Sequence, residues 1–129
     1  MALAYWCILI VALLPYLWVS IAKASGERFD NRDPRAWQAR QVSPRSHRAN
    51  AAQLNAFEAF APFAAAVLMA QMADVDPTRI GYLAVAFVAL RVLHGIFYVL
   101  GIAPLRSLVW AGGIAVVTWL MLLAAWHVA

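Results

Sequence analysis

Residues 1–22, MALAYWCILIVALLPYLWVSIA, contain no charged side chain and are long enough to cross a lipid bilayer as one helix. Residues 107–129 form a second uncharged run of the same length class. Two further apolar stretches, residues 49–73 and 80–105, lie between them, and each is interrupted by a single charged residue. The sequence therefore predicts four membrane-spanning helices.

Turn signals between the apolar stretches define where these helices begin and end. Asp76 followed by Pro77 is typical of a helix start, and Gly101 followed by Pro104 is typical of a helix end and a new start. We expect helices over residues 2–23, 47–73, 77–101 and 104–127, with a polar loop over residues 24–46. The predicted fold class is all-α, an integral membrane four-helix bundle in a single domain over residues 1–129.

The overall composition supports a membrane environment and excludes several classes of protein. Residues of the set AVILMFWYC make up 65% of the 129-residue chain, only 12% are charged, and the mean hydropathy is +0.74. A soluble domain carries about 25% charged residues, so this chain has too little polar surface for a globule in water. The single cysteine, Cys7, cannot form an intrachain disulfide.

The net charge of +4 reflects topology rather than a nucleic-acid interface, because the basic residues are concentrated between apolar runs. Seven of the ten Lys and Arg residues fall in this segment: Lys23, Arg28, Arg32, Arg35, Arg40, Arg45 and Arg48. The positive-inside rule places this loop in the cytoplasm and both termini on the non-cytoplasmic side. We expect contact with membrane lipid, which includes attraction of the loop to anionic lipid, and no nucleic-acid partner.

The first apolar run has one feature of a cleaved signal peptide and lacks two others. Residues 22–24 fit the small-x-small cleavage pattern, but no basic segment precedes the apolar run, which is twice as long as a minimal signal core. We expect this helix to be retained.

Two ionisable residues, Glu58 and Arg91, lie within the predicted spans, where such groups are costly and are functional candidates by default. Each lies ten residues from the cytoplasmic end of its helix, or roughly 15 Å at 1.5 Å per residue. Opposite charges at matched depth are expected to form an ion pair. One interpretation is that this pair is purely structural.

Further polar side chains share the faces of these two charges and point to a ligand. They recur at three- and four-residue steps, so each set forms one stripe along its helix. The stripe on the second span contains Arg48, Asn55 and Glu58, the stripe on the third contains Arg91, His94 and Tyr98, and Arg106 follows at the cytoplasmic mouth. These residues predict a cleft that opens to the cytoplasm and suits a small anionic or zwitterionic ligand.

Two sequence blocks resemble the MAPEG family, the membrane-associated proteins of eicosanoid and glutathione metabolism. The stretch Arg48-Ala-Asn-Ala-Ala-Gln-Leu-Asn55-Ala-Phe-Glu58 resembles the R-x(6)-N-x-x-E signature on the second helix of that family. The stretches Arg91-Val-Leu-His94-Gly-Ile-Phe-Tyr98 and Pro104-Leu-Arg106-Ser107 are similar to its third-to-fourth-helix segment. The DNRDP loop, residues 30–34, is similar to that of a bacterial branch and implies the bacterial inner membrane.

The resemblance implies a homotrimer with glutathione bound between neighbouring subunits near the cytoplasmic side. It assigns glutathione binding to five residues: Arg48, Asn55, Glu58, Arg91 and Tyr98. His94 is a further candidate because it shares a helix face with Arg91, and a polar bridge to a neighbouring helix is the alternative for it. It assigns the catalytic role to Arg106, which would stabilise the thiolate. Ser107, the next residue, is a second catalytic candidate, and an ordinary serine in a first helical turn is the alternative for it. The activated thiol would be conjugated to a small hydrophobic electrophile or would reduce a peroxide, which is the chemistry of a membrane glutathione S-transferase or peroxidase.

Other interpretations remain open at this point. Many relatives carry an arginine where this chain has Ala51, and the spacing from Tyr98 to Arg106 is one residue shorter than in some members. These departures favour an alternative, a non-catalytic membrane subunit or scaffold within a larger complex. A proton-coupled exporter is disfavoured because such proteins carry their buried acid on the first helix.

We expect no metal or haem site in this chain. His47, His94 and His127 lie at different depths, and no cluster of Cys or His offers a set of metal ligands. Four tryptophans of the spans are most simply lipid-facing or interfacial anchors: Trp6, Trp110, Trp119 and Trp126.

Overall fold

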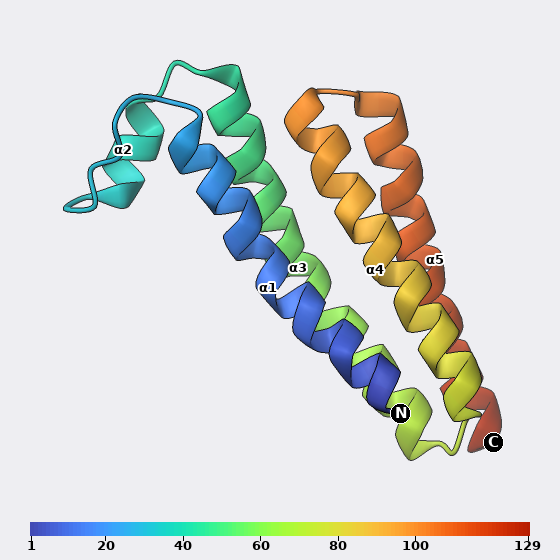
Figure 1. The fold of residues 1–129 in the computed structure, drawn as a ribbon. Coiled ribbons are helices and arrows are strands. Elements are labelled where there is room, and N and C mark those ends of the chain that lie inside the picture. The colour runs from blue at the N-terminus through green and yellow to red at the C-terminus, as the bar shows by residue number, and fades with distance from the viewer.

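The computed structural model describes residues 1–129, and all its regular elements are helices (Figure 1). They are α1 (Ala2–Ala24), α2 (Pro34–Arg40), α3 (Pro44–Met72), α4 (Pro77–Leu100) and α5 (Ala103–His127). All except α2 are long and apolar enough to cross a membrane. The predicted all-helical fold with four spans is confirmed.

The four long helices are arranged as two pairs that meet near the chain ends and diverge toward the end that carries α2 (Figure 1). α1 packs against α3 and α4, while α5 packs against α3 and α4. Both termini lie at the end of the molecule away from α2 (Figure 1). The α3–α4 turn lies at the end with the termini, and the α4–α5 turn lies at the other.

Two helix starts correct the predicted boundaries. Residues 34–40, which the sequence analysis placed in a loop, form α2, and α3 begins at Pro44 rather than at residue 47. Asp33 caps α2 by accepting a 3.1 Å hydrogen bond from the Ala36 backbone nitrogen, and Ser43 caps α3 in the same way through Ser46. The other three predicted ranges agree with the observed helices to within one residue.

The buried core is divided into two clusters, and their composition decides where open space remains. The larger cluster joins all four long helices near the chain ends, and in it the rings of Phe63 and Phe87 stack with their centres 4.1 Å apart. The smaller cluster contains Trp18, several alanines of α3 and Val99, but no residue of α5. α5 is therefore packed less tightly against α3 over the half nearer α2.

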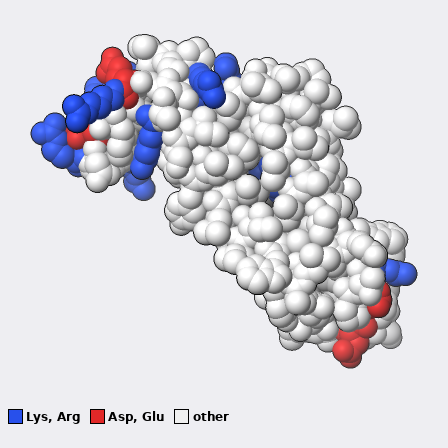
Figure 2. Space-filling view, viewed as in Figure 1, with Lys and Arg blue, Asp and Glu red and all other residues white.

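The outer surface matches a lipid environment. Many large apolar side chains of the four spans are exposed, among them Trp6, Leu108 and Trp126. Figure 2 shows charged atoms gathered at the two ends of the molecule, with the most basic surface around α2. Between these ends the visible face is uncharged apart from a small basic area in a central hollow (Figure 2).

Candidate functional site

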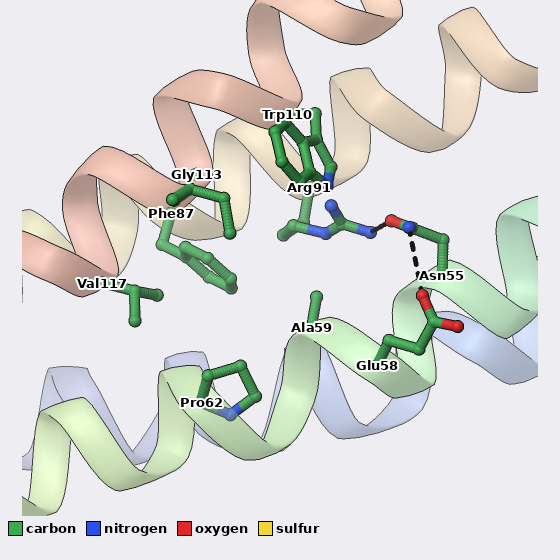
Figure 3. A pocket seen from close by; sticks show the side chains of 10 residues that line it. Asn55, Glu58, Ala59, Pro62, Phe87, Arg91, Trp110, Gly113 and Val117 are labelled. Carbon is green, nitrogen blue, oxygen red and sulfur yellow. Dashed lines mark hydrogen bonds between the residues drawn. The ribbon is translucent and has the colours of Figure 1, made fainter.

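Three polar side chains form a row between α3 and α4, part-way along the spans (Figure 3). Arg91 of α4 donates a 2.7 Å hydrogen bond from Nη2 to Oδ1 of Asn55 on α3. Asn55 in turn donates from Nδ2 to Oε2 of Glu58, at 3.4 Å. Asn55 therefore bridges the cationic and the anionic group.

This row corrects the prediction that Arg91 and Glu58 form an ion pair. The only ion pair within the chain joins Arg32 and Asp30 in the loop. Arg91 is 4% exposed, whereas Glu58 lies on an exposed face of α3. Asn55 is one helical turn before Glu58 and faces α4 more directly, so its amide takes the position beside the guanidinium.

The row borders a cavity of about 200 Å³ between α3, α4 and α5 (Figure 3). Asn55, Glu58 and Arg91 supply its polar side. Phe87 and Trp110 belong to its apolar side, together with small residues of α5. A cavity with a few convergent polar groups on an apolar floor is the usual form of a small-molecule site.

A second cavity of about 190 Å³ continues toward the α4–α5 turn. Its lining contains four of the predicted residues, His94, Tyr98, Arg106 and Ser107, and it shares Asn55 and Trp110 with the first cavity. The Arg106 guanidinium carbon lies 4.5 Å from the centre of the Tyr98 ring, which is a cation–π contact. The ring of His94 meets the Tyr98 ring edge to face, with centres 5.5 Å apart.

One polar atom beside this second cavity has no partner. His94 is 3% exposed, and its Nδ1 makes no hydrogen bond within the chain. Buried side-chain polar atoms are satisfied in the large majority of cases, so the unpaired Nδ1 is an exception within a residue that borders this cavity. The chain contains no group of three or more His, Cys, Asp or Glu side chains that could hold a metal ion.

A comparison of the sequence with protein families identifies a known group. The model of the MAPEG family matches residues 3–126, which is nearly the whole chain. The chain belongs to the MAPEG family. No curated protein and no solved structure matches it. Membership of this family, together with four apolar helices, identifies an integral membrane protein.

Arg48 is the predicted site residue that this MAPEG structure places elsewhere. It lines neither of the two cavities, and its Nε donates a 3.0 Å hydrogen bond to the backbone oxygen of Val99. Val99 lies in the last turn of α4, where backbone oxygens lack helical partners and attract cations. Gly101, the left-handed residue that ends α4, packs against the same guanidinium. In this chain Arg48 therefore caps α4.

Trp110 is the site residue that the sequence analysis of this MAPEG chain missed. Trp110 is 46% exposed, as expected of a lipid-facing anchor, and it also lines both cavities. The sequence indicates this role for Trp110, because Trp110 follows Arg106 by four residues and Ser107 by three on one helix. Residues at these spacings share a helix face.

Proposed function

We propose that this protein, acting as a single MAPEG-like domain over residues 1–129, binds glutathione between α3, α4 and α5 and activates its thiol. The observation that carries the proposal is the polar row of Glu58, Asn55 and Arg91, which leads directly to Arg106 through shared cavity walls. Ionisable and polar side chains are costly in a membrane segment, so such a set is by default a candidate functional site. MAPEG proteins generally use glutathione, which agrees with this proposal.

The charges of the site are complementary to those of glutathione, which carries one ammonium group, two carboxylates and a thiol. The exposed carboxylate of Glu58 is suited to the ammonium group. The Arg91 guanidinium has five N–H donors, and one of its nitrogens is engaged by Asn55, so further donors are available for a carboxylate. His94 and Tyr98 border the path between Arg91 and Arg106 and complete the proposed binding set.

Arg106 and Ser107 are assigned to the thiol. A free thiol has a pKa of about 8.5, and a neighbouring guanidinium favours the nucleophilic thiolate. With an aryl chloride, the thiolate sulfur forms a bond to the ring carbon, the carbon–chlorine bond breaks, and chloride leaves. The thiol proton passes to solvent. A small hydrophobic electrophile of this kind reaches the site from the lipid.

Glu58 also supports an oligomer in which the site is completed by a neighbouring copy. An ionised carboxylate facing lipid near the middle of a span is costly, and a second chain covering this face would remove that cost. The family resemblance implies a homotrimer, and the positive-inside rule places the basic loop in the cytoplasm. We propose this arrangement for the present chain.

Conjugation of glutathione to 1-chloro-2,4-dinitrobenzene in liposomes tests the proposal. Arg106→Ala is expected to lower kcat/KM by about 100-fold, the scale of losing one charged group that stabilises the reacting anion. Arg106→Lys retains the charge and is expected to recover part of the rate. Arg45→Ala removes an exposed basic residue outside both cavities and serves as the matched control.

The same preparation distinguishes catalysis from the alternative of a non-catalytic subunit. Glutathione binding by calorimetry with no turnover above background in the unmodified protein would contradict the catalytic part alone. Absence of binding, with a second membrane protein co-purifying at fixed stoichiometry, would favour the scaffold. Equal rates for Arg106→Ala and Arg45→Ala would remove Arg106 from the reaction.

A further inference from the structure

The largest open cavity of the molecule is not the one beside Arg91. It has a volume of about 780 Å³ and lies between α1, α2 and α3, at the basic end of the protein. Its α3 lining includes Asn50, Leu54 and Phe57, whereas the candidate glutathione site uses Asn55 and Glu58 on a different face of that helix. The two sites are therefore separate.

The lining of this cavity changes from apolar to cationic along the helices. At the deeper end Tyr16 of α1 and Phe57 of α3 meet edge to face, with ring centres 5.9 Å apart. Lys23 lies seven residues further along α1, or about 10 Å toward the loop, and His47 lies ten residues before Phe57 on α3. The cavity thus has an apolar end within the span and a charged end at the membrane surface.

The charged end favours an anion. Lys23, Arg35 and His47 line the cavity, and none of the six Asp and Glu residues of the chain does. The Lys23 ammonium is held 4.3 Å from the centre of the Phe29 ring, which fixes it at the cavity wall. The side-chain amides of Asn50 and Gln53 supply neutral donors between the cationic and the apolar ends.

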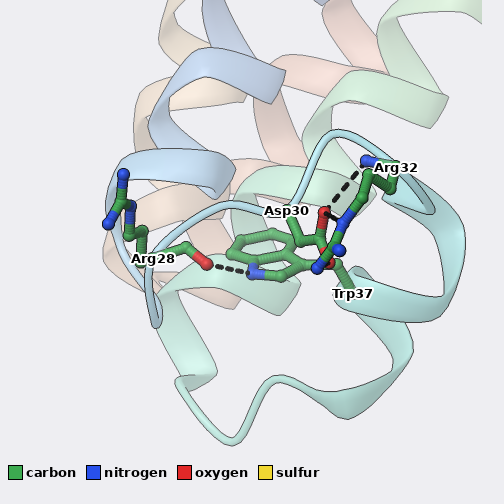
Figure 4. A network of polar contacts seen from close by, with 4 residues as sticks. All are labelled: Arg28, Asp30, Arg32 and Trp37. Carbon is green, nitrogen blue, oxygen red and sulfur yellow. Dashed lines mark hydrogen bonds and ion pairs between the residues drawn. The ribbon is translucent and has the colours of Figure 1, made fainter.

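α2 and the loop before it supply one wall of the cavity. Polar contacts within the chain hold this segment in place (Figure 4). Trp37 of α2 is 3% exposed, and its Nε1 donates a 3.0 Å hydrogen bond to the backbone oxygen of Arg28. Asp30 and Arg32 close the adjacent turn through paired hydrogen bonds of 3.0 Å. Because these contacts hold the wall in place within the chain, the cavity does not need a ligand to form.

We infer that this cavity binds one anionic phospholipid from the leaflet that contacts the basic loop. Its phosphate lies between Lys23 and Arg35, and one acyl chain runs along Leu54 toward Tyr16 and Phe57. Charge, polarity gradient and orientation all match a membrane lipid, and the volume falls within the range of about 300–1,000 Å³ for small-molecule sites. The inference does not depend on glutathione binding.

Native mass spectrometry tests this inference on protein reconstituted in nanodiscs of equal parts phosphatidylglycerol and phosphatidylcholine. We expect one phosphatidylglycerol retained per chain in preference to phosphatidylcholine. Lys23→Gln combined with Arg35→Gln is expected to lower this selective retention by roughly 25-fold, about 5-fold for each charge removed. Arg40→Gln combined with Arg45→Gln removes the same charge from residues outside the cavity and is expected to leave retention unchanged.

Several results would overturn the inference. Equal loss in both double variants would indicate general surface attraction, and equal thermal stabilisation by inorganic phosphate or by oleate would indicate a different anion. Leu54→Trp is expected to lower lipid retention without changing the mass of the oligomer. If it alters the oligomer and leaves retention unchanged, a second copy of the chain occupies the cavity. Thermal unfolding in phosphatidylcholine alone verifies that each variant is folded.

Discussion

Asn55 is the residue on which the polar geometry inside the membrane depends. Its amide accepts a hydrogen bond from Arg91 and donates one to Glu58. Among uncharged side chains of this length, an amide is suited to both tasks because it presents an oxygen acceptor and a nitrogen donor at one end. The bridge lets a buried guanidinium and an exposed carboxylate share one neutral partner.

Replacing Asn55 with leucine should therefore disrupt both neighbours at once. Loss of a hydrogen bond to a charged group costs about 1.5–3 kcal/mol, so we expect glutathione affinity to fall by roughly 10- to 100-fold. Calorimetry in detergent measures the affinity, and Gln53→Leu provides a control two residues away on another face of α3. Equal losses in the two variants would contradict a specific role for Asn55.

In the loop, the hydrogen bonds from Arg32 hold the pKa of Asp30 below its ordinary value of 3.8. A lowered pKa means that the interaction is fully present above the unfolded pKa and is lost as pH falls through the lower folded value. We expect a ¹³C NMR titration of the Asp30 carboxyl to show a midpoint below 3.8. Arg32→Gln should raise that midpoint, and Arg45→Gln should leave it unchanged. A midpoint that Arg32→Gln does not move would show that the turn is not held by this pair.

At the scale of helices, the residues that begin a helix indicate its position better than the composition of the segment does. Asp33-Pro34 and Ser43-Pro44 carry the same type of start signal as Asp76-Pro77. The polar composition of residues 24–46 nevertheless favours a loop, so composition and start signal disagree in this segment. The structure shows that the Asp33 cap and Pro34 begin the short helix α2, although this polar segment is too short to span the membrane.

The candidate site was predictable to the extent that helical periodicity determines it. His94 and Tyr98 follow Arg91 on one face of α4, and periodicity alone groups them. The direct partner of Arg91 and the position of Arg48 were not predictable in this way. Both depend on how α3 and α4 are rotated against each other, which is a property of packing rather than of either helix alone.

Packing between α1 and α4 rests on Gly95, and this leads to a stability prediction. A Cβ at this position would overlap the ring of Trp18, which is 4% exposed and has little room to move. We expect Gly95→Ala to lower the free energy of unfolding by about 1–3 kcal/mol, the usual cost of overpacking.

The control for this prediction is Gly113→Ala on α5, where a Cβ would make ordinary contact with Phe87 at 3.6 Å. Thermal unfolding in detergent compares the two variants. Trp18→Leu introduced together with Gly95→Ala should restore part of the lost stability. If the two single variants have equal stability, the close approach at Gly95 does not limit the packing of α1 on α4.

For the whole molecule, the separation of charge predicts an orientation. Both chain ends lie away from α2, and the basic surface is concentrated around α2 (Figures 1 and 2). Single-cysteine variants in a Cys7→Ala background test this orientation with a membrane-impermeant maleimide. In intact bacterial cells, Thr78→Cys at the start of α4 should be labelled. Arg40→Cys at the end of α2 should be labelled only after lysis. The reverse pattern would place the basic loop outside.

The bond between Arg91 and Asn55 also has a consequence for how the protein is made. An arginine near the centre of a span costs about 2.5–3.5 kcal/mol on insertion scales. Its hydrogen-bond partner belongs to the preceding span, which is joined to α4 by residues 73–76 alone. During synthesis the α3–α4 hairpin can thus offset this cost before α5 has left the ribosome. Arg91 thus enters the bilayer together with the side chain that binds it.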